Sequence, residues 1–414
     1  MGPLNKIFYG YVPILCALCS SDVLTFITIP FLDDIGNRLI VLMVISVVTF
    51  LSQKNINSSI ATRSVLLHYL SVLILIMLTV LTNYDMRGGY VLMVMSFTLS
   101  CLAVASDDYR VVIVKLSNVL NALAITSVVV YALEPIIKMV PFLPRGFNGS
   151  GLPLVNLFTC VLVDLPGYAR LFGIFREPGV YCIVLVVALL LLSSRDDLEL
   201  RRKNIIACAI VIASYLTYSI SGYVSILLAF IVYSRTTNKG LNKRKSSSYL
   251  QVFIFILLLN FVRVIFFGAG GASELQNAID KFTKKDTSYV QREATVYADL
   301  ETWSNNIFFG AGLTEGYQET ERIGAEKTNL KLHNTNTWTG YLMIYGVFLA
   351  FYIYYGYYRL AGVLFSASSD RTLAVISLLI AFSSQSLVNN GLVLMLPLIG
   401  LVGSARGRLV NAKL

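Results

Sequence analysis

Two arginines and a glutamate fall where they could hold a phosphate group. The stretch RLFGIFREPGVY places Arg170, Arg176 and Glu177 directly before a long apolar run. Pro178 suits the first position of a helix, because its missing N–H costs nothing there. The free N–H groups and the positive end of that helix bind anions such as phosphate, and guanidinium groups add paired donors. The stretch predicts an anion site, and a plain Arg176–Glu177 surface ion pair is the alternative.

A second stretch, DTSYVQREATVYADLETW, adds another arginine. Ser288-x-x-Gln291 resembles a capping box. Helical spacing then puts an apolar set and one arginine on a single face: Tyr289, Arg292, Val296, Leu300 and Trp303. A buried arginine needs an anionic partner, whereas an arginine at the rim extends its head to water. Both interpretations of Arg292 stay open at this point.

A third stretch, KLHNTNTWTG, contains His333, one of only two histidines. Near arginines, a histidine suggests acid–base work or phosphate contact. Asn334 and Thr335 could instead cap the apolar helix that follows. The sequence shows no cluster with zinc-ligand spacing and no phosphate-binding Walker loop. We therefore expect chemistry without a metal and without a cofactor.

The elements that position these residues are membrane helices. Of 414 residues, 56% are hydrophobic and only 14% are charged, which excludes an ordinary soluble protein. We predict an all-α polytopic membrane protein with a single integral membrane domain, 1–414. Runs long enough to cross a bilayer predict twelve spans near 8–30, 38–52, 64–82, 89–105, 111–133, 179–194, 204–219, 222–234, 249–267, 337–358, 372–388 and 391–404.

Charge predicts how these spans are oriented. The block SRTTNKGLNKRKSSS is the strongest indication of a cytoplasmic loop. Residues 204–234 as one helix would be ~46 Å long and would put that block outside, so we split them near YSISGYV. Both termini are then cytoplasmic, and 134–178 and 268–336 become two long periplasmic segments. Cytoplasmic loops account for most of the net charge of +10, so no nucleic-acid partner is expected.

The order of the motifs resembles the O-antigen polymerase (Wzy-type) and O-antigen ligase superfamily. The resemblance covers about Arg170 to Gly346 and the number of spans. A Ser-rich break in this family often carries an arginine, whereas here Ile220 and Gly222 flank Ser221. The motifs that carry the resemblance are Arg170-x-x-Gly173-x-x-x-Glu177-Pro178, the break at Ser219–Gly222, Arg292, Gly310-Ala311-Gly312 and His333-Asn334-Thr335.

The resemblance implies a metal-independent, C-type-like glycosyltransferase of the bacterial inner membrane, with its site facing the periplasm. The donor would be a polysaccharide on undecaprenyl pyrophosphate. The acceptor would be a lipid-linked repeat unit in a polymerase, or lipid A–core in a ligase. Membrane lipid and a chain-length regulator protein are the further partners that it allows.

Residue roles follow from the same resemblance. The pyrophosphate would be held by Arg170, Arg176 and Arg292, with weaker contributions from Asn334, Tyr289 and Arg263. His333 or Glu177 would take the hydroxyl proton. A flippase or other transporter is the alternative from another class. Transporters hold their charges near the midplane between inverted repeats, whereas these groups cluster at the outer end and no repeat is evident. Polymerase is therefore favoured, followed by ligase.

Overall fold

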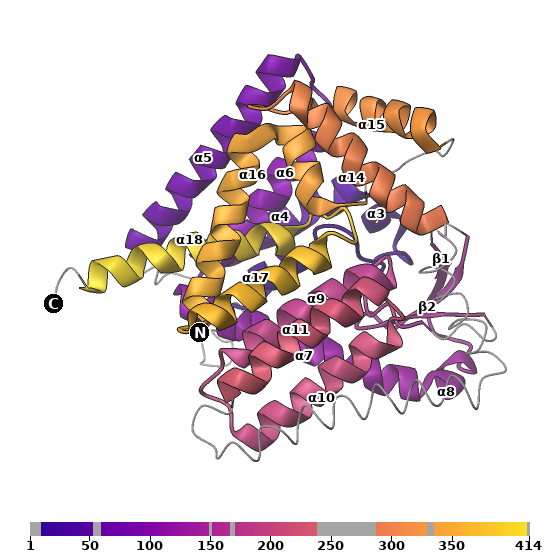
Figure 1. Cartoon of the computed structure of the whole chain (residues 1–414). Coiled ribbons are helices and arrows are strands. Elements are labelled where there is room, and N and C mark those ends of the chain that lie inside the picture. Colours follow the sequence, from indigo (N-terminus) through magenta and orange to yellow (C-terminus); the bar gives the residue numbers. More distant parts are fainter. Residues whose placement is uncertain are drawn as a thin grey trace.

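A computed structural model describes residues 10–52, 59–148, 151–165, 170–237, 287–328 and 335–411. These residues are mostly helical (Figure 1). The predicted span 249–267 and the residues Arg263, His333 and Asn334 lie outside the described part of the chain.

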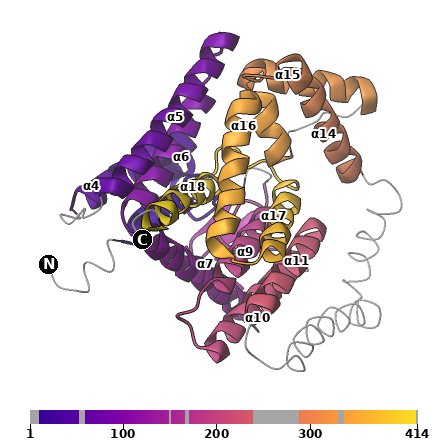
Figure 2. The same cartoon turned by 60° about the vertical axis from the view of Figure 1, so that its left-hand side comes forward.

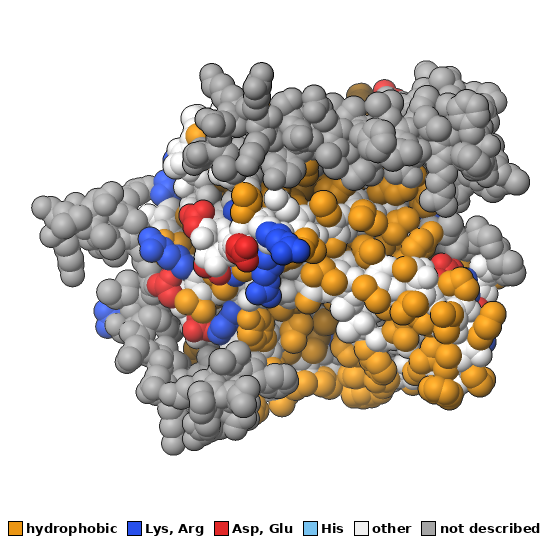
Figure 3. Space-filling model, turned by 90° about the horizontal axis from the view of Figure 1, so that it is seen from below, with side chains coloured by type: hydrophobic (Ala, Val, Ile, Leu, Met, Phe, Trp, Pro, Cys, Tyr) orange, Lys and Arg blue, Asp and Glu red, His pale blue; other side chains and the backbone are white. Residues whose placement is uncertain are grey.

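Five described helices are long and apolar enough to cross a membrane. They are α4 (Ile35–Ser52), α5 (Ser59–Asn83), α6 (Gly88–Ala105), α7 (Tyr109–Ala132) and α16 (Thr337–Leu364). Large apolar side chains stay exposed along α4 and α5, as expected of surfaces that face lipid. Among the described residues on the face shown in Figure 3, charged side chains gather toward one end and apolar side chains predominate toward the other. The model therefore supports a mainly α-helical membrane protein.

The shorter apolar helix α9 (Pro178–Ser193) is the centre of the fold. Apart from Gly179, every residue of this helix is buried. A helix that is apolar on all sides must be surrounded by protein or lipid. Here it is surrounded by α7, α10 (Leu200–Leu216), α11 (Ile220–Thr237) and α17 (Ser368–Phe382). A second tightly packed pair joins α16 to α18 (Gly391–Asn411) (Figure 2).

The first predicted span, 8–30, is not a continuous helix. Helix α2 (Val12–Leu18) has 7 residues, residues 19–29 are not helical, and α3 (Pro30–Asp33) follows. The polar run Ser20–Ser21–Asp22 ends the helix. The Ser20 hydroxyl donates to Ala17 O at 2.8 Å and accepts from the N–H of Gly391 at 3.0 Å. This part of the span prediction is wrong, because these buried polar groups bond to other elements.

The predicted break within 204–234 is confirmed. Helix α10 ends at Leu216 and α11 begins at Ile220. Between them Tyr218 has φ of +51°, a left-handed conformation that is rare for a residue with a side chain. Other predicted segments are helices with similar bounds, since α4, α5, α6, α7 and α9 begin and end within a few residues of the predicted positions.

The first long segment, 134–178, contains structure that the all-α prediction omitted. After α8 (Glu134–Lys138), three short strands form an antiparallel sheet in the order β1-β2-β3 (Figure 1). They are β1 (Arg145–Phe147), β2 (Pro153–Asn156) and β3 (Val161–Val163). The sheet is tied to its neighbours, because Asn156 Nδ2 donates to Thr25 O at 2.7 Å and Val161 N donates to Gly173 O at 2.6 Å.

Helix α16 folds back on itself at Gly346. The glycine has φ 71° and ψ −173°, which interrupts the helix. A straight helix would hold Trp338 and Tyr354 ~24 Å apart, yet their ring centroids are 5.0 Å apart. The halves 337–345 and 347–364 therefore run back past each other, instead of crossing as one rod.

The gap at the bend is filled by the FFGAG turn. Ala311 N donates to Met343 O at 2.8 Å, and Val347 N donates to Ile307 O at 2.9 Å. The turn connects α14 (Thr287–Asn305) to α15 (Gly312–Thr328). Backbone from the second long segment thus satisfies the polar groups that the bend leaves open.

Candidate anion site at the start of α9

The predicted helix start at Pro178 is confirmed. Glu177 is the N-cap residue, with extended backbone (φ −139°, ψ 148°), and Pro178 opens the helix. No side chain of the described residues caps this end. The first N–H groups therefore remain directed out of α9, at the positive end of its dipole.

Arg176 lies at this helix end and is fixed by Asp22. Its main-chain N–H donates to Asp22 O at 2.8 Å, and its Nη2 lies 3.4 Å from Asp22 Oδ1. Its Nε lies 3.7 Å from Glu177 Oε1. The Arg176 side chain is still 52% exposed. An arginine has five N–H donors, so this one keeps donors for a ligand.

Arg292, on α14, comes to the same place from the other long segment. Burial lowers the pKa of its guanidinium, and the nearby Glu177 carboxylate acts in the opposite direction. Glu177 thus lies within electrostatic range of Arg292, although 115 positions separate them in the sequence. It is an anionic group near a half-buried arginine.

The predicted face of α14 is wrong. The residues buried on this helix are Thr295, Ala298, Asp299 and Thr302, which follow helical spacing. Val296 and Trp303 are only half-buried and Leu300 is exposed. Arg292 stands three residues before Thr295 and seven before Asp299, so it continues the buried face toward the start of α14 and is itself half-buried.

Asp299 is the unexpected acid of this region. Thr339 Oγ1, on the first turn of α16, donates to its Oδ2 at 2.5 Å, and Thr320 Oγ1, on α15, donates to its Oδ1 at 3.2 Å. Asp299 is fully buried, and desolvation raises its pKa to about 7 although both hydroxyls act to lower it. This carboxyl joins the helix that carries Arg292 to the first half of α16.

A polar turn at 383–390 completes the site and was missed by the sequence interpretation. A Cβ at Gly179 would lie only 2.6 Å from Gln385 Nε2, so the turn packs directly on the start of α9. Thr337 Oγ1 donates to Gln385 O at 2.5 Å. Asn390 caps α18 by accepting from the N–H groups of Leu392 and Val393, and its Nδ2 lies 3.4 Å from Asp22 Oδ2. The starts of α9, α16 and α18 therefore converge, and each brings a positive dipole end.

Arg170 contacts the turn between α10 and α11. Its Nε donates to Thr217 O and its Nη2 donates to Tyr218 O, both at 3.3 Å. These carbonyls lie at the strained turn between α10 and α11. The guanidinium thus stabilises that turn, and its predicted pyrophosphate contact stays a prediction. Tyr289 belongs to the first turn of α14.

Two charged residues near this region stand within apolar runs of the sequence. Asp22 is a charge within an apolar run, and Arg38 is another, near the start of α4. Arg38 is 97% buried, and its Nη1 lies 3.5 Å from Val23 O. Charges inside apolar runs are costly and so indicate function. Among the described residues, no three His, Cys, Asp or Glu side chains are grouped to hold a metal ion.

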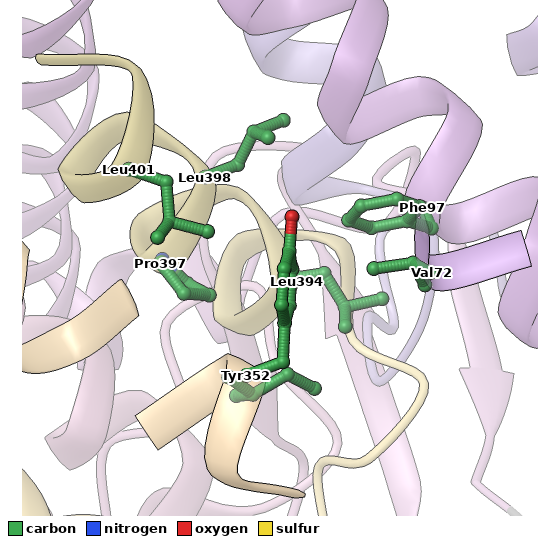
Figure 4. Close-up of a pocket in the computed structure, with 8 residues that line it drawn as sticks. Val72, Phe97, Tyr352, Leu394, Pro397, Leu398 and Leu401 are labelled. Carbon is green, nitrogen blue, oxygen red and sulfur yellow. The ribbon is translucent and has the colours of Figure 1, made fainter. Parts of the chain in front are cut away.

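An apolar cavity lies elsewhere, between α5, α6, α16 and α18 (Figure 4). In Figure 4, Tyr352 stands between Val72 and Phe97 on one side and Pro397 on the other. Its hydroxyl is hydrogen-bonded to His68. The lining offers no charge, so this cavity does not suit an anion.

No protein-family model, curated protein or solved structure matches this chain. The function is therefore argued from the chemistry of the site at α9.

Proposed function

We propose that this protein is a membrane glycosyltransferase of the O-antigen polymerase type. It would move a growing polysaccharide from undecaprenyl pyrophosphate to the sugar of a new lipid-linked repeat unit. The observation that carries the proposal is the uncapped start of α9 beside Arg176, with Arg292 of another segment within electrostatic range of the N-cap residue Glu177. Such a site suits a pyrophosphate better than a neutral sugar.

The chemistry follows from where charge develops. A hydroxyl oxygen of the acceptor attacks the anomeric carbon of the donor, and the bond from that carbon to the pyrophosphate oxygen breaks. Negative charge grows on the leaving lipid pyrophosphate, where fixed arginines and helix N–H groups stabilise it most. The hydroxyl proton would pass to Glu177 or to His333. The exposed Glu177 side chain, 47% accessible beside Arg176, can reach an acceptor.

The membrane arrangement belongs to the same proposal. We infer twelve spans in the bacterial inner membrane, both termini in the cytoplasm and the site toward the periplasm. The start of α9, the α10–α11 turn and residues 383–390 lie at one end of the bundle, as Arg170 and Gln385 link them. The isoprenoid tail would stay in the bilayer, so donors would enter sideways between helices.

The decisive experiment is gel analysis of lipopolysaccharide from a strain that lacks the gene. A polymerase predicts core carrying a single repeat unit. Core alone, with lipid-linked polymer accumulating, would mean a ligase. Unchanged long chains would refute both assignments.

A further inference from the structure

A stripe of exposed apolar side chains runs along α7 and does not stop where that helix ends. Ile125, Val129 and Leu133 are 39%, 51% and 45% exposed. Ile136 on α8 is 64% exposed and Met139 is 80% exposed. Ile125 and Val129 share one face of α7, Leu133 joins α7 to α8, and Met139 directly follows α8. The lipid-facing surface of a membrane-length helix thus continues into the first long segment.

Large aromatic groups extend the same kind of surface. Phe142 is 85% exposed and Phe147 is 69% exposed. On β1 a Cβ at Gly146 would lie 3.4 Å from Ile27, so that face of the strand is packed. Side chains alternate along a strand, so Arg145 and Phe147 occupy the opposite face. A contiguous apolar surface of this kind marks contact with a protein or a membrane.

The charges of this segment neutralise one another. Residues 134–165 contain two acidic and two basic side chains. Glu134 pairs with Lys138, and Asp164 pairs with Arg145 at 3.2 Å. Neither carboxylate is therefore left without a cation to repel anionic headgroups.

We propose that α8 and the residues up to β1 lie in the headgroup layer of the bilayer, with Met139 and Phe142 inserted among the upper acyl chains. The occupant of this surface is phospholipid, because the stripe is continuous with the lipid-facing side of α7 and because its charges are paired. Aromatic and amphipathic segments prefer this layer. The inference does not depend on the proposed enzymatic activity.

Contact of this segment with the membrane surface would also fix the depth of the candidate site. Two hydrogen bonds connect the sheet to the chain segments that carry Asp22 and Arg176. Asn156 bonds to Thr25, and Val161 bonds to Gly173. These bonds flank the Asp22–Arg176 pair on both of its chain segments. A sheet that rests on the membrane surface would therefore hold Arg176 at a constant depth relative to the headgroups.

Depth-dependent quenching of tryptophan tests the proposal in the full chain. The variants F142W and M139W are reconstituted into phosphatidylcholine–phosphatidylglycerol vesicles whose acyl chains are brominated at a shallow or a deep carbon. The emission of the native Trp303 and Trp338 is measured in the parent protein and subtracted. V129W, within α7, is the membrane control, and Q318W, exposed on the charged helix α15, is the aqueous control.

We expect both added tryptophans to lose emission with shallow bromines and to lose less with deep ones, whereas V129W responds to deep bromines. Quenching of F142W and M139W no greater than that of Q318W would overturn the proposal. A surface that is free in water would give that low quenching, and so would a surface covered by a second copy of the chain. All four positions are exposed, and near-parental thermal unfolding of each variant verifies that it has folded.

Discussion

Arg176 is held by Asp22 through two different contacts, one from its main chain and one from its guanidinium. The main-chain bond is 2.8 Å and the ion pair is 3.4 Å. Asp22 has φ of +58° and also accepts from Ser21 Oγ at 3.0 Å. A strained residue kept in place by several neighbours is typical of a functional site. The pair sets the position of Arg176 while half of its side chain faces outward.

Replacing Arg176 by alanine should abolish or strongly reduce long polysaccharide chains. A charged hydrogen bond is worth about 1.5–3 kcal/mol, which corresponds to roughly a 10- to 100-fold loss of rate or affinity. The measurement is the lipopolysaccharide ladder of a complemented deletion strain, with protein abundance followed by immunoblot. R322A is the matched control, because Arg322 is 54% exposed and pairs only with Glu319 and Glu326 among the described residues. Long chains from R176A at normal abundance would contradict the anion site.

Arg170→Ala should act on stability. It removes donors from two carbonyls at the turn between α10 and α11, and unsatisfied buried carbonyls cost about 1–3 kcal/mol each. We expect a lower unfolding temperature in detergent and less protein in the membrane. An unchanged unfolding temperature together with lost polymer would instead give Arg170 the pyrophosphate contact.

Asp299 predicts a pH dependence of stability. Its folded pKa of about 7 lies above that of an unfolded aspartate, so the folded protein binds the extra proton between pH ~4 and 7. Stability should therefore fall as pH rises through this window, by at most about 4 kcal/mol, and level off above it. Thermal unfolding of the parent and of D299N across pH 4–8 measures the difference. The asparagine variant should lose this slope, and an equal slope in both proteins would show that another group titrates.

Gly346 should tolerate no side chain. Its φ of 71° is accessible mainly to glycine, and a Cβ there would collide with the Phe308 carbonyl. G346A is expected to lose several kcal/mol or fail to accumulate. Gly362 lies in the same helix with open space around it, so G362A should be neutral or stabilise by up to ~1 kcal/mol. Membrane abundance and unfolding temperature compare the two variants, and equal behaviour would argue against the bend.

Local signals predicted part of this architecture. Proline at a helix start, the excess length of 204–234 and uniform apolar runs located α9, the α10–α11 break and most other helices. Each of these features depends on neighbours along the chain. The face of α14 could not be predicted in this way, because Asp299 is buried by hydroxyls from α15 and α16. Hydropathy cannot anticipate a polar face whose partners come from elsewhere.

The candidate site was likewise predicted only in part, because some of its residues are recognised locally and others only through the fold. Arg176, Glu177 and Arg292 were selected from the sequence. The structure pairs Arg176 with Glu177 and places Glu177 within electrostatic range of Arg292, and their binding of an anion stays a prediction. Asp22, Gln385 and Asn390 were missed as members of the site because they stand in or beside apolar runs that hydropathy assigns to spans. The sequence did contain a sign of them, because a polar residue within an apolar run costs free energy to bury in a membrane. His333, Asn334 and Arg263 stay predictions.

The bend in α16 also constrains how the protein is made. The run of 28 residues is long and apolar enough to enter the membrane as one straight span. Its final shape requires the turn at 307–311 to supply two backbone hydrogen bonds at the gap. The two halves of α16 can therefore pack together only when this turn occupies the gap. Folding of the turn between α14 and α15 and closure of the α16 hairpin are thus one coupled event.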